Sequence, residues 1–283
     1  MGSDIDDALA LAYLLCQPRC ELVGVTTVSG EAPLRAEMAS AMCRHVGRGD
    51  IPIHSGAEQA LLADIRQKAA PQAKALGERP RQRGFARNPA VEFMRKTIRE
   101  RPGEVTLLAI GPMTNVGLLF ATDPEIPALL KSLVLMCGQF QSQMSAEWNA
   151  ENDPHATAIV YGNGFQKRPG QHTSYGLDVT LKCVMPAAEC RRRFTAKVLE
   201  PVRDFAEVWF AGSPTITWHD PLAAACIFEP RLCTYRQGKV SVSLNPPTLG
   251  WTVFSPWSEE KVHTVAETVS AESFFEHYFS VVR

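Results

Sequence analysis

The stretch VTLLAIGPMTNVGLLFA, residues 105–121, decides the fold class of this 283-residue chain. Its first part, Val105–Ile110, has the length and apolar composition of a buried β-strand. The strand runs into the turn residues Gly111 and Pro112, and a helical pattern follows over Met113–Ala121. A strand, a glycine turn and a helix in this order form the repeating unit of a mainly parallel sheet covered by helices.

Two further segments have the same pattern. Leu22–Val28 leads through a Ser-Gly turn into a helical stretch near Pro33–His45, and Leu133–Met136 ends at a Cys-Gly turn. We therefore predict an α/β fold with a mainly parallel, open, doubly wound sheet flanked by helices. Ligands of such sheets bind beyond the carboxyl ends of the strands, where these glycine turns lie, so we expect the chemistry there.

The remaining segments add elements around this sheet. Lys197–Ala211 and Ser270–Val282 have helical patterns, whereas Thr234–Leu244 and Gly250–Phe254 are predicted as strands of a small appended region. The polar stretch Pro71–Asn88 is predicted as a mobile surface loop that borders the ligand crevice. No internal repeat or long linker divides the sequence, and we expect one domain.

The composition excludes several classes of function. Hydrophobic residues make up 45% of the chain, charged residues 21%, and the net charge is -1. Because there is no long basic run, neither nucleic acid nor a membrane surface is an expected partner. No stretch approaches the roughly 20 apolar residues that cross a bilayer. The eight cysteines have no metal-ligand spacing, so we expect reduced thiols in a soluble, cytoplasmic protein.

Three carboxylates lie close together in the opening segment, at Asp4, Asp6 and Asp7, directly before an apolar helical stretch. Acids in the first turn of a helix stabilise its dipole, and one would be enough for that effect. Three so close together repel one another unless a cation or hydrogen-bond donors neutralise them. Helix capping and a hard metal ion with oxygen ligands are therefore equal alternatives.

A second polar segment surrounds Glu147 and Asn149. An extended backbone would turn both side chains to one side, as two groups that bind hydroxyls of one sugar require. The simpler interpretation is a polar loop, with Asp153 and Pro154 starting the next helix. From this segment alone the simpler interpretation is favoured.

His219 and Asp220 begin another apolar helical stretch. Asp220 could be an N-cap, with Pro221 at the first helical position. That interpretation leaves His219 unexplained. A histidine beside a carboxylate can donate or accept a proton near neutral pH.

The sequence resembles the nucleoside hydrolases in four motifs that occur in the same order. They are the acidic opening, the segment Leu107–Asn115, the Glu-Trp-Asn segment and His219-Asp220-Pro221, and Leu177–Thr180 is a supporting match. The resemblance implies an enzyme of purine or pyrimidine salvage. It would hydrolyse the N-glycosidic bond of ribonucleosides to ribose and free base, using calcium-bound water. It also implies a homodimer or homotetramer, a nucleoside as the ligand and no organic cofactor.

Position by position, the resemblance implies a calcium site at Asp7, Asp220 and the backbone carbonyl of Ile110. Asp6 would hold the ribose hydroxyls, and His219 would assist the departing base. Fixed carboxylates would stabilise the positive charge on the sugar as the glycosidic bond breaks. A divalent cation would lower the pKa of the attacking water.

The resemblance also implies a sugar pocket formed by Met136, Glu147 and Asn149. After the Ser-Gly turn the family commonly has an asparagine that contacts ribose, whereas this chain has Glu31, which cannot donate a hydrogen bond while ionised. A glutamine could replace a second such asparagine, and the sequence does not choose among the candidates Gln139, Gln141 and Gln143.

Family members usually begin with an apolar strand and an Asp-x-Asp motif, and this sequence starts after both. We expect residues 1–283 to be a single nucleoside hydrolase-like domain that is N-terminally truncated, with its first strand missing. The loss would expose two unpaired strand edges and, if the chain is complete, reduce calcium affinity and turnover. The alternative is an impaired homologue that binds a ribosyl ligand or acts as a subunit partner. A phosphohydrolase is disfavoured because phosphate-binding motifs are lacking.

Overall fold

The computed structural model describes residues 1–141, 145–162 and 171–283. Its main sheet has six strands in the order β3-β4-β5-β10-β8-β9. These strands are β3 (Thr106–Ala109), β4 (Ser132–Met136), β5 (His172–Tyr175), β10 (His263–Val269), β8 (Cys233–Val242) and β9 (Thr252–Ser255). Within the described ranges, no helix has both the length and the apolar character needed to cross a membrane.

Strands β3, β4, β5 and β10 run parallel, in a register that pairs Leu107 with Leu133 and Leu135 with Ser174. The predicted mainly parallel α/β sheet is therefore confirmed. Strands β8 and β9 were predicted as an appended region, but they continue this sheet as its antiparallel edge. The connection is made by β10, which pairs with β5 on one side and with β8 on the other.

A separate parallel pair is formed by β1 (Val25–Thr27) and β2 (Ile53–Ser55). Among the described residues, β1 pairs only with β2, and β3 pairs only with β4. In the described ranges β1 and β3 each have one edge without a strand neighbour, and the missing first strand stays a prediction. All four residues of β3 are only half-buried, because its free edge faces a cavity.

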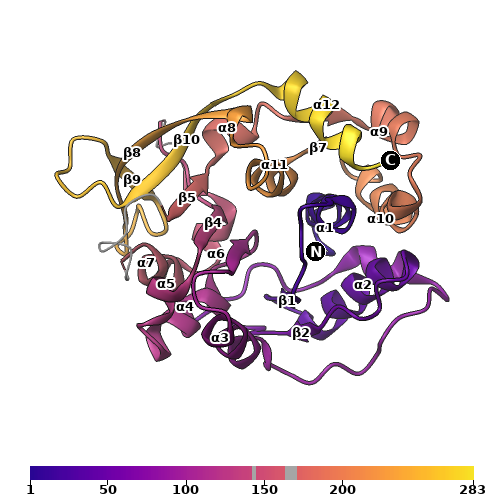
Figure 1. The fold of residues 1–283 in the computed structure, drawn as a ribbon, viewed down its shortest axis with the longest axis horizontal. Coiled ribbons are helices and arrows are strands. Elements are labelled where there is room, and N and C mark those ends of the chain that lie inside the picture. The colour runs from indigo at the N-terminus through magenta and orange to yellow at the C-terminus, as the bar shows by residue number, and fades with distance from the viewer. Residues whose placement is uncertain (142–144, 163–170) are drawn as a thin grey trace.

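Twelve α-helices in the described ranges surround these sheets (Figure 1). They are α1 (Asp6–Cys16), α2 (Ala32–His45), α3 (Ala90–Glu100), α4 (Thr114–Thr122), α5 (Ile126–Leu129), α6 (Trp148–Asn152), α7 (Pro154–Gly162), α8 (Leu177–Thr180), α9 (Ala187–Arg193), α10 (Glu200–Phe210), α11 (His219–Cys226) and α12 (Ala271–Val281). The predicted helices at residues 197–211 and 270–282 correspond to α10 and α12.

Helix α1 lies in the middle of the molecule, packed against α11 and α12 (Figure 1). Its alanines and leucines are strong helix formers, and the two acids in its first turn stabilise the helix by interacting with its dipole. Tyr13 stacks on Tyr278 of α12 with ring centroids 5.7 Å apart. The Tyr278 hydroxyl donates to the Leu9 carbonyl over 2.8 Å. These contacts fix the direction of α1 and therefore the position of its acidic N-terminus.

The stretch Pro71–Asn88 is not a loop throughout. Pro71–Leu76 forms a 3₁₀-helix, and Gln72 and Leu76 are buried where it packs against α2 and α10. The surface-loop prediction was wrong here, because Ala73, Ala75 and Leu76 pack this short helix against the hydrophobic core. The remaining elements are the antiparallel strands β6 (Val184–Pro186) and β7 (Thr215–Thr217), and the 3₁₀-helices η3 (Lys197–Leu199) and η4 (Pro230–Leu232).

Candidate active site

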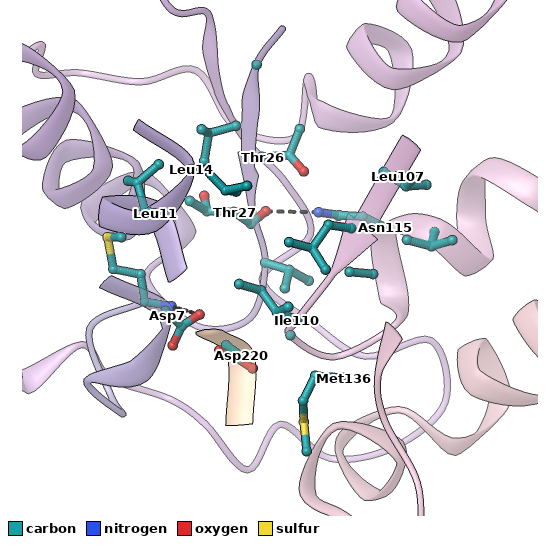
Figure 2. A pocket seen from close by; sticks show the side chains of 18 of the residues that line it. Asp7, Leu11, Leu14, Thr26, Thr27, Leu107, Ile110, Asn115, Met136 and Asp220 are labelled. Carbon is teal, nitrogen blue, oxygen red and sulfur yellow. Dashed lines mark hydrogen bonds and ion pairs between the residues drawn. The ribbon is translucent and has the colours of Figure 1, made fainter. Parts of the chain in front are cut away.

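A cavity of about 910 Å³ lies between β1, β3 and α1. Leu11 and Leu14 enter it from α1, opposite Leu107 of β3 (Figure 2). Asp7 and Asp220 point toward each other in the same view. The cavity is therefore apolar between the strand edges and acidic where the N-termini of α1 and α11 meet.

The acidic part is a cluster of Asp6, Asp7 and Asp220, whose ligand oxygens all lie within 4.8 Å of one another. Asp6 and Asp7 belong to the first turn of α1, and Asp220 belongs to the first turn of α11. Asp220 is not an N-cap, because that position is held by Trp218 without a side-chain bond. Ile5, the N-cap of α1, has none either. The capping interpretation therefore does not account for these acids.

Burial makes the cluster electrostatically unfavourable on its own. It raises the pKa of Asp6 to about 7, with a further contribution from Asp7, and raises that of Asp220 well above its usual value. Burial followed by the charge of Asp6 raises the pKa of neighbouring Asp4 to about 8. The backbone nitrogen of Met1 lies 2.6 Å from Asp7 Oδ1.

Closely spaced carboxylate oxygens are the ligands that hard divalent cations prefer. A cation would also remove the mutual repulsion that raises these pKa values. The donor set of the acidic cluster therefore fits a metal ion.

Glu147 is the N-cap of α6 and is buried. Its carboxylate accepts hydrogen bonds from the backbone N–H groups of Gly138 (3.1 Å), Asn149 (2.8 Å) and Ala150 (3.1 Å). Burial raises the pKa of Glu147, and the three donors lower it. The backbone N–H groups thus hold the carboxylate, and no side-chain cation pairs with it in the described ranges.

Asn149 lies in the first turn of α6, so the prediction that Glu147 and Asn149 share an extended backbone was wrong. Asn149 Nδ2 donates to the Ile110 carbonyl over 3.2 Å and to the Met136 carbonyl over 3.0 Å. Because these carbonyls end β3 and β4, the helix brings both polar side chains to the carboxyl edge of the sheet. The other interpretation of this segment was correct in one respect, since Asp153 and Pro154 do begin α7.

His219 lines the cavity in the first turn of α11. Its Nδ1 lies 2.7 Å from Thr180 Oγ1 at the end of α8. Burial lowers the pKa of His219, and the charge of Asp4 acts against that shift. The imidazole is therefore anchored on one side, close to the acidic segment.

Most of the site residues predicted from the sequence meet in this cavity. Those that line it are Asp6, Asp7, Ile110, Met136, Glu147, Asn149, His219 and Asp220. Glu31 is exposed and outside the lining, and its Oε2 accepts a hydrogen bond from the Ala70 N–H over 2.7 Å. Gln139 and Gln141 also lie outside the lining, and Gln143 lies outside the described residues.

Sequence reasoning missed two residues that position the site. Asn115 stood in a recognised motif but received no role. Its Oδ1 accepts from the Ala57 N–H and its Nδ2 donates to the Thr27 carbonyl, both over 2.9 Å, so it joins the β1-β2 pair to α4 (Figure 2). Thr180 also stood in a matched segment, and only the fold places its hydroxyl on His219.

The sequence profile of the inosine-uridine preferring nucleoside hydrolases matches residues 1–276. The chain is 32% identical to the pyrimidine-specific ribonucleoside hydrolase RihA of Citrobacter koseri, over 88% of this chain and 84% of that protein. It is 27% identical to uridine nucleosidase 1 of Arabidopsis thaliana, over 96% of this chain and 88% of that protein. The chain therefore belongs to the family of inosine-uridine preferring nucleoside hydrolases, and it is an enzyme.

Solved structures agree on the fold. The purine-preferring ribonucleoside hydrolase from Gardnerella vaginalis superposes with a TM-score of 0.84 at 24% identity, covering 100% of this chain and 96% of that one. An inosine-guanosine nucleoside hydrolase gives a TM-score of 0.85 at 23% identity, covering 100% and 97%. At these identities the likeness shows the fold alone.

Proposed function

We propose that this enzyme hydrolyses the N-glycosidic bond of ribonucleosides to ribose and a free base, with Ca²⁺ as its metal. One observation carries the proposal. Carboxylates from α1 (Asp6 and Asp7) and α11 (Asp220) meet in a single cavity that Glu147 and His219 also line.

Asp7, Asp220 and the Ile110 carbonyl would hold the ion. Oxygen-only donors support calcium in preference to zinc, which takes nitrogen and sulfur ligands. When bound, the ion would supply a positive charge that lowers the pKa of water and orients the ribose hydroxyls. Asp6 is proposed to accept hydrogen bonds from those hydroxyls, because its buried carboxylate faces the same cluster.

The reaction forms a bond between a water oxygen and C1′ of ribose and breaks the bond between C1′ and the base nitrogen. The water gives up one proton, which a carboxylate of the acidic cluster is proposed to accept. The electron pair of the broken bond leaves with the base, so positive charge develops on the sugar. The buried carboxylate of Glu147 is placed to stabilise that charge, because a fixed charge in a low-dielectric site requires little reorganisation. Met136 and Asn149 are proposed to contact the sugar beside it.

His219 is proposed to deliver a proton to the departing base, which neutralises the leaving nitrogen. Glu31 stays a candidate for a ribose contact only if its bond to the Ala70 N–H opens. The names of the similar enzymes include both pyrimidine-specific and purine-preferring hydrolases. They support a ribonucleoside as the substrate and leave the base open. A homodimer or homotetramer in the cytoplasm is the corresponding proposal for assembly and location.

The direct test is release of ribose from uridine, cytidine, inosine and adenosine, measured as reducing sugar with added Ca²⁺ and with EGTA. We expect release from at least one nucleoside and its loss in EGTA. Release that persists in the chelator would remove calcium from the proposal. Binding of a ribosyl ligand without any release would identify the non-catalytic relative instead.

Variant enzymes test whether turnover depends on the acidic cluster. Asp220→Asn removes one carboxylate charge while retaining the side-chain volume, and we expect no turnover. The matched control is Asp50→Asn, because Asp50 pairs with Arg48 on the surface. That control should keep the activity of the unaltered protein.

A further inference from the structure

Thr180 holds the imidazole of His219 through a short hydrogen bond. Its Oγ1 lies 2.7 Å from His219 Nδ1, and the same oxygen lies 3.2 Å from the Gly176 carbonyl oxygen. Thr180 is fully buried at the end of α8, whereas His219 borders the cavity. The bond therefore connects a fixed hydroxyl to a ring that faces the candidate active site.

The protons of this pair can be assigned from what each group can donate. A hydroxyl has one proton and can also accept, whereas a carbonyl oxygen only accepts. When the Thr180 proton is donated to the Gly176 carbonyl, the hydroxyl oxygen is left to accept the proton on His219 Nδ1. The second ring nitrogen, Nε2, has no hydrogen-bond partner within the part of the chain that the structure describes.

We propose that Thr180 is a positioning residue for hydrolysis, which keeps the Nδ1 proton of His219 in place and presents Nε2 as the atom that protonates the leaving base. This inference rests on the proposed function. As the bond from C1′ to the base breaks, the base nitrogen takes the electron pair and receives the Nε2 proton from the imidazolium form of His219. The ring becomes neutral and keeps its Nδ1 proton on Thr180 Oγ1, so the bond that orients it does not change.

A purely structural role for Thr180 would be different. A threonine at a helix end often bonds the carbonyl four residues earlier, and such a bond affects local stability alone. A positioning role affects a substrate only when its leaving group needs a proton. A natural base needs one, whereas p-nitrophenolate leaves without one.

The first experiment determines which ring nitrogen of His219 carries the proton, by nitrogen NMR of protein labelled at histidine. The variant His219→Gln assigns the signal. We expect the neutral ring to carry its proton on Nδ1 in the unaltered protein and in Thr180→Ser. In Thr180→Val the proton should move to Nε2 in most molecules, because the acceptor for Nδ1–H is gone. An unaltered protein protonated on Nε2 would overturn the proposal without any measurement of activity.

The second experiment compares leaving groups. Thr180→Val should lower kcat for the best natural nucleoside by about 10- to 100-fold, which does not exceed the lower limit of the contribution of a general acid, because the ring is displaced and not removed. KM should change little, and p-nitrophenyl riboside should be cleaved at nearly the original rate. Thr180→Ser should restore the natural reaction. Equal losses on both substrates would assign Thr180 a structural role.

A matched control is Thr157→Val. Thr157 is also fully buried and its Oγ1 donates to the Asp153 carbonyl over 2.8 Å, but it does not line the cavity. Both substrates should be cleaved at unchanged rates. If the unaltered protein releases neither ribose nor p-nitrophenol, the proposed function fails, and the NMR measurement still decides whether Thr180 fixes the ring.

Discussion

The backbone N–H of Asp220 donates to Asp6 Oδ2 over 3.1 Å, which joins two residues 214 positions apart. The bond brings the N-termini of α1 and α11 together. The positive ends of both helix dipoles face the carboxylates and stabilise their charge, while burial acts in the opposite direction. The acidic cluster therefore needs a further positive charge to remain ionised in the folded protein. We expect the stability of the protein to depend on a bound metal ion.

Calcium should raise the thermal stability of the protein. At a free concentration about 100-fold above its Kd, a ligand that binds only the folded state stabilises it by about 2.7 kcal/mol. Thermal unfolding with Ca²⁺ and with EGTA measures the shift, which we expect to be several degrees. Asp220→Asn should abolish it, whereas Asp50→Asn should not. Identical unfolding temperatures with and without the ion would contradict the metal site.

Glu147→Gln should impair both turnover and folding. The introduced amide must place its NH₂ group against backbone N–H donors, of either Asn149 or Gly138 and Ala150. We expect kcat to fall by about 100- to 1000-fold, and the free energy of unfolding to fall by about 1–3 kcal/mol.

The control for that change is Glu151→Gln in the same helix, because Glu151 pairs with Arg66 at the surface. Steady-state kinetics and urea unfolding of both variants measure the two effects. If Glu147→Gln kept the turnover of the unaltered protein, Glu147 would have no role in stabilising charge on the sugar.

His263 should make the protein sensitive to acid. Burial lowers its pKa to about 4, the charge of Lys239 adds to this shift, and the hydrogen bond to the Tyr161 carbonyl acts against it. The ring also accepts from the Val240 N–H through Nδ1. Between pH 4 and the ordinary histidine pKa of about 6.5, the unfolded chain binds one more proton than the folded one. Stability from this group is therefore complete above the upper value and is lost as the pH falls toward the lower one.

The loss should be on the order of 3 kcal/mol across that window. It is measured by urea unfolding from pH 4 to 8. His263→Gln should be less stable at neutral pH and less dependent on acid, whereas His45→Gln, at a half-buried position, should keep the acid dependence of the unaltered protein. An equal acid dependence in His263→Gln would exclude this group as the cause.

Asn115→Asp should weaken the link between the β1-β2 pair and α4. A carboxylate oxygen would replace Nδ2 and face the Thr27 carbonyl, so a 2.9 Å hydrogen bond becomes a repulsive contact. We expect the free energy of unfolding to fall by about 1–3 kcal/mol or more. Because β1 borders the site, KM for the nucleoside should also rise. Chemical denaturation and substrate titration measure the two changes, and an unaffected KM would limit Asn115 to a structural role.

Much of the fold could be predicted because the local signals were strong. Apolar runs followed by glycine turns identified β3 and β4, and the periodic apolar residues of α10 and α12 identified those helices. The predicted strand Leu22–Val28 is shorter in the structure, where only Val25–Thr27 pairs with a neighbour. The place of β8 and β9 in the main sheet could not be predicted, since it depends on a pairing with β10 that no local pattern specifies.

The candidate site was predictable in composition but less so in geometry. The resemblance to nucleoside hydrolases identified Asp7, His219 and Asp220 together, although no local pattern brings α1 and α11 side by side. The contacts of Glu31 were not predictable, because they depend on the path of the distant residue Ala70. The contact of Thr180 with His219 likewise spans 39 positions.

The unpaired edges of β1 and β3 affect the order in which backbone amides of the folded protein exchange with solvent. Backbone amides on those edges face a cavity instead of a neighbouring strand, so water reaches them without any unfolding. Deuterium should therefore enter the β-structure first at its centre, at Thr26 and Leu108, whose backbone N–H groups face the free edges, and later at β5, which has a strand on both sides. The backbone amides at the free edges of β1 and β3 therefore exchange before those of the inner strands of the main sheet.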